Sequence, residues 1–469
     1  MIIKKIRDLI TPIRQKGSFA QNFFVSFSGS AFATLLGILL TPVMTRLYPP
    51  ASYGQVAVFN SISSNLAALS ILAYHSALPL PKTKDKALAL VQLTVVLSLG
   101  SFVLTMVPLL LFGNWILPWL HVQQMGTWFY LLPALVLVFN LTLVMSSWYT
   151  RTKDFRTRAG VDVATTVVGR VVTLGYGWLS HGQPAGLIIG DVMTKLTSFV
   201  GLFQSGIHRE VGELWRTFSW QRIKAIASEY REFPYYVLPG GYVSTLSAQL
   251  PIYFLASGFG SSVVGLYSFS VTMLEMPVHL TGSAMAPVFY QKASEVYNSE
   301  PERLKEITLS LYNKLLYLGV LPLGVLTVYG DWIFKVAFGA RWEMAGVFTG
   351  YLGYYYIFKL TSQSTSTLYS VLGKQRYLLL SNILLLVTRA AALALGLYLR
   401  DVNTTLLLFG LGSLACIFIV DMHILHLVGL PVVRIALRTI LILGSTLLLL
   451  KAARYGLEYL FPQFIATWL

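Results

Sequence analysis

The stretch that decides the fold class is ALALVQLTVVLSLGSFVLTMVPLLLF, residues 87–112, in which no side chain carries a charge. At about 1.5 Å per residue, a helix of this length can cross the roughly 30 Å hydrocarbon core of a bilayer. A strand of a membrane barrel would instead alternate apolar and polar residues over about 10 positions. Residues 23–43 form a second run of the same kind. The pattern therefore predicts membrane-spanning helices.

The composition of the whole chain supports this prediction. Charged residues make up 12% of the 469 residues and hydrophobic residues 55%, whereas a soluble domain has about 25% charged residues. The formal net charge of +16 would suggest a nucleic-acid partner in a soluble protein. In a membrane protein, basic residues instead gather in cytoplasmic loops. We therefore expect contact with membrane lipid and no nucleic acid.

Apolar runs between turn and charge clusters predict about twelve spans, and hence an all-α, polytopic membrane helix bundle. A further apolar run near 435–450, followed by an amphipathic tail, predicts one or two additional C-terminal helices. The limits of the twelve spans are 22–45, 54–79, 87–112, 126–150, 158–180, 184–206, 235–257, 262–289, 308–330, 344–371, 377–399 and 403–428.

The long loop between the sixth and seventh spans predicts two six-helix lobes. The openings of the second and eighth spans are similar, Tyr53-Gly54-Gln55-Val56 and Val264-Gly265-Leu266-Tyr267, which suggests a parallel repeat around a central cavity. The expected domains are an N-terminal lobe at 1–206, a cytoplasmic amphipathic linker at 207–234, a C-terminal lobe at 235–428 and an additional helix or helix pair at 429–469.

The distribution of Lys and Arg predicts the orientation. If the N-terminus is inside, 25 of the 35 Lys and Arg fall in inner segments and six fall in outer segments. Because basic residues favour the cytoplasmic side, we expect a multi-pass protein with a cytoplasmic N-terminus. Residues 2–16 predict a short basic amphipathic segment on the inner surface.

The sequence has no motif for catalysis, metal binding or cofactor binding. We find no His pair at helical metal-binding spacing, no Walker-type loop and no dinucleotide fingerprint. The single cysteine, Cys416, excludes a disulfide framework and a thiolate metal site. The histidines offer no motif that would place a base beside a nucleophile. We expect no enzymatic activity, no metal and no cofactor.

Four basic residues remain within the spans, and they predict a cationic lumen. They are Arg170, Lys195, Lys359 and Arg389. A cation at the bilayer centre costs about 2.5–3.5 kcal/mol on insertion scales, so it should face a cavity or a partner. No acid lies within one helical turn of Lys359 or Arg389, which favours a cavity for these two. Such a lumen suits an anionic substrate.

Acidic residues near two of these cations leave an alternative open. Asp191 and Lys195 are at i, i+4, and Asp162 lies on the same helical face as Arg170. Internal neutralisation of each pair is as good an explanation as a role in the lumen. Asp421, near an inner membrane end, is expected to be interfacial.

Further polar residues share faces of the eighth and tenth spans. Glu275 and His279 lie one turn apart, and we expect either ion coupling or a packed hydrogen-bond network. Tyr355, Lys359 and Gln363 share a second face that we expect to line the lumen. The tyrosines beside Lys359 suit sugar stacking, although tyrosines also line helix contacts.

Several stretches, in this order along most of the chain, resemble the polysaccharide-transporter flippases. The chain is thus similar to lipid-linked oligosaccharide flippases of the O-antigen or exopolysaccharide type, in the multidrug/oligosaccharidyl-lipid/polysaccharide exporter superfamily. The stretches that carry the resemblance are 46–54 (RLYPPASYG), 231–234 (REFP), 249–251 (QLP), 258–260 (GFG), 265–267 (GLY), 275–277 (EMP), 286–289 (APVF) and 338–342 (FGARW).

The resemblance implies a fold, a substrate and a location. It implies two six-helix lobes around a cationic cavity, with a V-shaped opening that alternates sides, in the bacterial cytoplasmic (inner) membrane. The implied substrate is an undecaprenyl-pyrophosphate-linked oligosaccharide repeat unit, and a polysaccharide polymerase complex is a candidate partner. The matching residues are mostly structural turns, so they transfer no catalytic set. The extra C-terminal run departs from a plain twelve-helix plan.

Two other functions compete with the flippase. A cation-coupled drug or small-molecule antiporter of the same superfamily would favour acidic lobe residues, and the four central cations argue against it. A membrane polysaccharide polymerase or ligase would need a sizeable outer loop bearing catalytic groups, and the predicted outer loops are short. We therefore expect a transporter that flips a lipid-linked oligosaccharide by alternating access.

Overall fold

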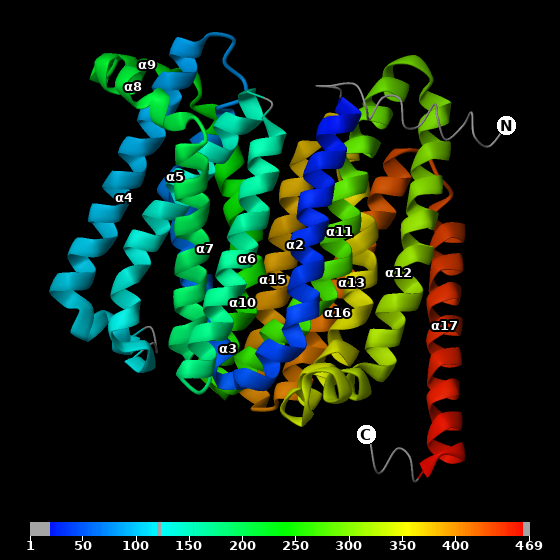
Figure 1. Cartoon of the computed structure of the whole chain (residues 1–469). Helices are drawn as coiled ribbons and strands as arrows, with labels where there is room; N and C mark the ends of the chain where they lie inside the picture. Colours follow the sequence, from blue (N-terminus) through cyan, green and yellow to red (C-terminus); the bar gives the residue numbers. More distant parts are fainter. Residues whose placement is uncertain (1–18, 120–122, 153, 463–469) are drawn as a thin grey trace. The chain divides into compact units, whose positions relative to one another are not determined.

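The computed structural model describes residues 19–119, 123–152 and 154–462, and these residues form helices without a strand. The basic segment predicted at 2–16 lies outside the described residues. Figure 1 traces the helices. The chain divides into two compact units, each with its own packing, and the structure of each unit is described by itself.

Unit 1 comprises residues 1–48 and 58–245. Its helices are α2 (Phe19–Leu47), most of α3 (Pro50–Ser70), η1 (Tyr74–Ala77), α4 (Lys84–Trp119), η2 (Gln123–Leu131), α5 (Leu132–Thr152), α6 (Phe155–Leu179), α7 (Pro184–Gln204), η3 (Ile207–Arg209), α8 (Val211–Arg216), α9 (Trp220–Glu229), the π-helical turn η4 (Phe233–Val237) and the start of α10 (Leu238–Phe259). In unit 1, α6 packs against both α2 and α7. The buried Tyr48 hydroxyl donates to the Thr173 carbonyl at 2.6 Å and fixes the end of α2 to α6.

Unit 2 comprises residues 49–57 and 246–469. Its helices include the start of α3, the end of α10, α11 (Ser261–Ser299), α12 (Pro301–Phe338), η5 (Ala340–Trp342), α13 (Glu343–Thr365), α14 (Leu368–Val371), α15 (Gln375–Leu399), α16 (Val402–Leu427) and α17 (Val432–Leu460). Helix α13 is its central element, because it packs against α11, α12 and α16 and buries 15 residues. Helix α17 lies along α12 (Figure 1), where the Tyr312 and Thr439 hydroxyls are 3.2 Å apart.

The predicted all-α membrane bundle is confirmed. A helix of at least 21 residues lies at each of the twelve predicted spans, and the additional C-terminal run is the single helix α17 within the described residues. Eight of the described helices are long and apolar enough to cross a membrane individually, and α2 and α3, which meet at a 120° bend, count together as a ninth. Helices α6, α10 and α13 are less apolar than these spans, because charged residues, Ser, Gln and Tyr replace aliphatic residues in them.

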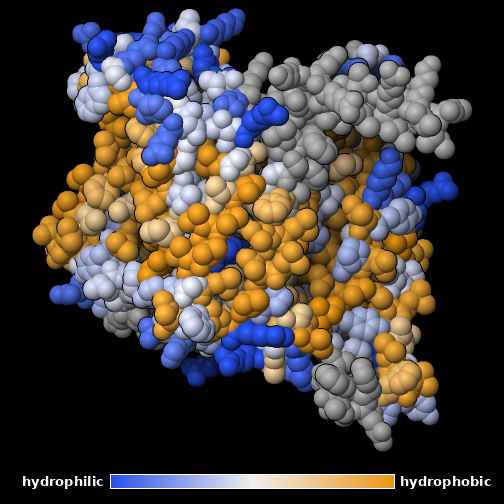
Figure 2. Space-filling model, viewed as in Figure 1, coloured by the Kyte–Doolittle hydropathy of each residue, from blue (hydrophilic) through white to orange (hydrophobic). Residues whose placement is uncertain are grey.

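The outer surfaces of the helices suit hydrocarbon. In Figure 2, hydrophobic side chains cover the middle of the helices in view, and hydrophilic side chains gather toward their ends. Leu104 of α4 and Leu449 of α17 expose 74% and 71% of their surface. Large contiguous apolar surfaces are rare on soluble monomers. A lipid bilayer, in contrast, solvates such surfaces.

The segment that sequence analysis predicts as an amphipathic linker contains the short helices α8 and α9. Ile223 and Ile226 of α9 are buried against the start of α4 and the turn before it. Lys86 of α4 pairs with Glu229 of α9 at 2.6 Å. The amphipathic pattern of α9 thus reflects packing onto its own unit.

Helices α3 and α11 touch through their backbones within unit 2. A Cβ atom on Gly54 would lie 1.7 Å from the Ser261 carbonyl oxygen, and a Cβ atom on Gly265 would lie 1.8 Å from the Pro50 carbonyl oxygen. Both distances are shorter than any non-bonded contact, so this crossing requires glycine on both helices. The two glycines belong to the two similar span openings that the sequence shows.

Helix α16 begins at a capping aspartate and carries the single cysteine of the chain. The Asp401 carboxylate accepts the Thr404 backbone N–H at 2.8 Å, as a helix N-cap does. Hydrogen bonds from the Thr404 side chain and backbone lower the pKa of Asp401. Cys416 is buried in unit 2, where its thiol donates to the Thr388 hydroxyl at 3.3 Å.

Candidate functional site

A cluster of four polar side chains joins α11 to α13 in unit 2. We call Glu275, His279, Tyr356 and Lys359 the polar cluster. Glu275 Oε1 accepts hydrogen bonds from Lys359 Nζ and, at 3.4 Å, from the Tyr356 hydroxyl. His279 Nε2 lies 3.6 Å from Glu275 Oε2. The cluster forms because Glu275 and His279 are one turn apart on α11, and Tyr356 and Lys359 are one turn apart on α13.

The polar cluster is accessible although its charges are paired. The side chains of Glu275 and Lys359 are 30% and 32% exposed, and that of His279 is 72% exposed. The acid near Lys359 comes from a different helix, α11, so spacing along α13 could not reveal it. Glu275 and Lys359 have no net charge as a pair, so a bound anion would compete with Glu275 for the Lys359 ammonium group.

Gln363 extends the same polar face by one turn of α13. The Gln363 side chain packs against Gly282 of α11, where a Cβ atom would lie 2.4 Å from Gln363 Cδ. Gln363 Oε1 is buried and accepts no hydrogen bond within the part of the chain that the structure describes. This oxygen can therefore accept a hydrogen bond from a water molecule or a ligand hydroxyl.

Arg389 is held inside unit 2 by neighbouring helices. Its Nε donates to the Ser413 hydroxyl at 3.0 Å, and its Nη1 donates to the Ser247 carbonyl at 3.1 Å. The guanidinium carbon lies 5.2 Å and 5.0 Å from the ring centroids of Tyr355 and Phe409. Arg389 is only 6% exposed and Tyr355 only 4%. In this conformation both residues support the packing around α13 and do not face solvent.

The predicted charges of unit 1 lie on α6 and α7. Lys195 forms an ion pair with Asp191 on α7, as the i, i+4 spacing predicts. Arg170 Nη1 lies 2.9 Å from the Met44 sulfur of α2. Asp162 is half-buried on α6, where its backbone carbonyl accepts the Thr166 hydroxyl at 2.9 Å. The structure thus brings Asp191 and Lys195 together and directs Arg170 toward α2.

Asp421, which the sequence places near the inner end of its span, is buried within unit 2. Its side chain on α16 is buried, with 1% of the residue exposed. The carboxylate accepts the Thr361 hydroxyl at 2.5 Å and the Thr365 hydroxyl at 3.2 Å. The apolar pattern of α16 placed Asp421 near the end of a span, and it could not show that hydroxyl groups of α13 solvate the carboxylate there.

A basic cavity between α11 and α12 was also missed in the sequence. This cavity of about 530 Å³ is lined by Lys292, Arg303 and Lys314, with Glu306 as the acid among its lining residues. Its apolar wall includes Phe289. In the sequence, these three cations lie in a predicted inner segment, where they indicate only the orientation of the chain in the membrane. Their positions near the ends of two long helices that pack together place them around one cavity.

Comparison with known proteins identifies the family. The profile of the family described as "Polysaccharide biosynthesis protein" matches residues 43–346, which is more than half of the chain. The chain belongs to this polysaccharide biosynthesis protein family. No curated protein matches the sequence. The family assignment agrees with the resemblance drawn from the sequence motifs.

Solved structures show that this polysaccharide biosynthesis protein has the fold of the MOP superfamily transporters. An inward-facing multidrug resistance MATE family transporter of that superfamily matches with a TM-score of 0.61, at 13% identity over 90% of this chain and 97% of its own. The lipid II flippase MurJ, in an inward closed conformation, matches with a TM-score of 0.60, at 12% identity over 92% and 98%. A MOP superfamily transporter from Pyrococcus furiosus matches with a TM-score of 0.52, at 14% identity over 87% and 94%.

These matches agree with the predicted fold of a multi-pass membrane helix bundle. The similar structures are those of transporters and a flippase. At these identities the likeness concerns the fold.

Proposed function

We propose that this protein flips an undecaprenyl-pyrophosphate-linked oligosaccharide from the cytoplasmic to the outer leaflet of the bacterial cytoplasmic membrane. The family assignment supports a role in polysaccharide biosynthesis, and the fold supports transport. The observation that carries the proposal is the accessible polar cluster, in which the Lys359 side chain of α13 is one-third exposed. An ionisable group inside a span marks a substrate or ion pathway.

The chemistry of the substrate explains why such a pathway is needed. A pyrophosphate and its sugars lose hydration in hydrocarbon, and each unpaired polar group costs several kcal/mol there. In the proposed mechanism Lys359 leaves Glu275 and binds the pyrophosphate, while Gln363 and His279 offer hydrogen bonds to sugar hydroxyls. The polyprenyl tail stays in lipid. Movement of net negative charge outward is favoured by about 2.3 kcal/mol per charge for each 100 mV of inside-negative potential.

The basic cavity supports the handling of an anionic lipid. Lys292 and Arg303 are paired with Glu295 and Glu300 at 3.4 Å and 3.2 Å, so a phosphate head group would compete with these acids, while the apolar wall suits an attached hydrocarbon chain. Arg170, Lys195 and Arg389 complete the proposed cationic pathway. In the present conformation Lys195 is neutralised by Asp191, and Arg389 is buried. We therefore assign Lys359 the main substrate contact and Arg389 a positioning role beside it.

The test removes the Lys359 ion pair as a whole. The double variant Glu275→Gln/Lys359→Met leaves no unpaired charge in the cluster, so it should fold and reach the membrane. We expect it to reduce surface polysaccharide by at least tenfold, because the pyrophosphate loses its cation. The measurement is surface polysaccharide per cell, normalised to the amount of the protein in the membrane.

The matched control is the double variant Glu343→Gln/Lys335→Met. Lys335 is 31% exposed and lies 3.5 Å from its acid, so this pair resembles the first in exposure but lies at the end of α12. The control should keep normal polysaccharide. Normal polysaccharide in the Glu275/Lys359 variant, at normal protein level, would contradict the proposed function.

Cation-coupled drug antiport is the second candidate function, and the accessible carboxylate of Glu275 is the observation that favours it. Antiport predicts that cells expressing the protein expel a cationic dye such as ethidium and that Glu275→Gln abolishes the efflux. The flippase predicts no efflux. Dye retention in expressing cells, measured by fluorescence, separates the two functions.

A further inference from the structure

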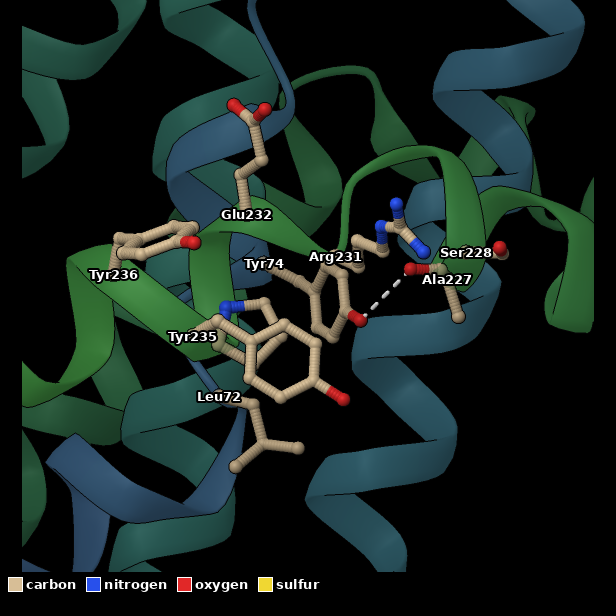
Figure 3. A pocket seen from close by; sticks show the side chains of 9 residues that line it. Leu72, Tyr74, Ala227, Ser228, Arg231, Glu232, Tyr235 and Tyr236 are labelled. Carbon is tan, nitrogen blue, oxygen red and sulfur yellow. Dashed lines mark hydrogen bonds between the residues drawn. The ribbon is translucent and has the colours of Figure 1, made fainter.

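Unit 1 contains a pocket that the predicted pathway does not include. We call it the tyrosine pocket, and its volume is about 740 Å³. Sites for small ligands typically measure about 300–1,000 Å³. Figure 3 shows the lining side chains, with the Tyr74 and Tyr235 rings next to each other. The pocket lies where the turn after α3, the end of α9 and the η4 turn meet, at the end of the helices that is predicted to be cytoplasmic.

The backbone around the tyrosine pocket is irregular on two sides. Leu72 and Ala73, which are not glycines, have left-handed φ angles of 47° and 60°. Residues 233–237 form a π-helical turn. Both kinds of irregular backbone are enriched at functional sites. They can direct toward one site side chains that a regular helix would hold apart. The Tyr74 hydroxyl donates to the Ala227 carbonyl at 3.0 Å and fixes the first of these segments to α9 (Figure 3).

The polar side chains of the pocket are available to a ligand. Ser228, Arg231, Glu232, Tyr235 and Tyr236 are exposed. No hydrogen bond or ion pair is made by these five side chains to the residues that the structure describes. Together they offer hydroxyl and guanidinium donors, hydroxyl and carboxylate acceptors, and the faces of aromatic rings.

The charge balance of the pocket favours a sugar over a phosphate. One cation and one anion, Arg231 and Glu232, line it, so the two charges balance. A polyanion would be repelled by Glu232 as it is attracted by Arg231. A sugar ring, in contrast, presents hydroxyls that need both donors and acceptors, and an apolar C–H face that packs on an aromatic ring.

We infer that the tyrosine pocket binds the sugar rings of the lipid-linked oligosaccharide on the cytoplasmic side, an inference that rests on the proposed function. Tyr235 and Tyr236 supply the stacking surfaces. Glu232 accepts and Arg231 donates hydrogen bonds with ring hydroxyls. The site would therefore select the repeat unit by its sugars, separately from the pyrophosphate contact at Lys359.

The experiment measures binding without transport. The probe is the oligosaccharide repeat unit released from the surface polysaccharide of the host, free of lipid and phosphate. Its dissociation constant for the purified full-length protein is measured by calorimetry in detergent. We expect Tyr235→Ala to weaken binding at least tenfold and Tyr235→Phe to retain most of the affinity, because the ring remains. Tyr235 is 70% exposed, so neither substitution should unfold the protein.

The control variant is Tyr398→Ala. Tyr398 is 83% exposed at the end of α15 in unit 2, and this substitution should leave binding unchanged. Inorganic pyrophosphate should not displace the oligosaccharide. Wild-type affinity in Tyr235→Ala, displacement by pyrophosphate, or no binding by the wild-type protein would each overturn the inference.

The inference and the proposed function can fail separately. The Glu275→Gln/Lys359→Met variant should bind the free oligosaccharide like the wild type, because its tyrosine pocket is intact. If this variant binds the sugar and also exports normal polysaccharide, the proposed function is contradicted while the sugar site stands. If Tyr235→Ala binds normally while the double variant loses polysaccharide, only the sugar site is overturned.

Discussion

At the residue scale, Arg389 shows how a guanidinium is accommodated inside a membrane-spanning unit. Its Nε and Nη1 groups point to hydroxyl and carbonyl oxygens of two other helices, and its flat faces meet aromatic rings. Arginine suits this position because its donors are spread over a rigid plane, whereas lysine has a single ammonium group. The geometry therefore depends on the shape of the side chain as well as on its charge.

We expect Arg389→Lys to destabilise the protein by about 2 kcal/mol, since a hydrogen bond from a charged group contributes about 1.5–3 kcal/mol and lysine cannot reach Ser247 and Ser413 together. The measurement is thermal unfolding followed by tryptophan fluorescence. Arg400→Lys, at an exposed loop position, is the matched control and should unfold like the wild type. Equal stability of the two variants would show that Arg389 is not a structural element.

The same scale shows what sequence can predict about charge pairs. Asp191 and Lys195 are one turn apart, so their pairing follows from helix geometry alone. Glu275 and Lys359 are 84 positions apart, and only the packing of α11 against α13 brings them together. A pattern of charges on one helix cannot identify a partner on another, which is why Lys359 looked unpaired in the sequence.

At the scale of elements, the crossing of α3 and α11 is the most demanding contact of unit 2. We expect Gly54→Ala and Gly265→Ala each to destabilise the protein by about 3 kcal/mol, because a Cβ atom at either position would overlap a carbonyl oxygen and the helices would have to separate. Thermal unfolding and the yield of monodisperse protein measure the effect.

Gly100→Ala is the control for this crossing. A Cβ atom on Gly100 of α4 meets no atom within 4 Å, and alanine favours the helix by about 1 kcal/mol over glycine. This variant should therefore be as stable as the wild type or more stable. If the three alanine variants unfolded alike, the close approach of α3 and α11 would not be real.

The helices themselves were largely predictable, and their ends were less so. The apolar run of α11 suggested an end near residue 289, but the helix continues to Ser299, and α12 begins at Pro301 instead of 308. The additional turns contain Lys, Arg and Glu, so no apolar run marks them. Hydrophobicity reports where lipid contacts a helix, and it does not report where the backbone hydrogen bonds stop.

At the scale of the whole molecule, the order of the thirteen long helices within the described residues and the distribution of basic residues predict the topology. With a cytoplasmic N-terminus, α17 should end on the outer side. Alkaline phosphatase, which requires disulfides and folds outside the cytoplasm, should be active when fused after Leu460 and inactive when fused after Lys374. A green fluorescent reporter should show the reverse pattern. Active phosphatase after Lys374 would contradict the orientation.

The tyrosine pocket could not be predicted because its walls come from two stretches of the chain that are 153 positions apart at Tyr74 and Ala227. In the sequence, Tyr235 and Tyr236 looked like the start of a span, and Tyr74 looked like the end of another. A left-handed turn at Leu72 and a π-helical turn after α9 bring them together. No periodic pattern encodes such turns, so sequence reasoning found the spans and missed this pocket between their ends.

The interior position of Cys416 has a practical consequence. As the only thiol of the chain, and one that is sealed within unit 2, it should resist maleimide reagents in the folded protein. A cysteine introduced at His279 or Tyr236, both largely exposed, would then be the reactive thiol of its variant. The native cysteine should therefore contribute little labelling of its own. Spectroscopic probes could be attached to introduced cysteines, and the distances between such probes could be recorded during turnover without first removing Cys416.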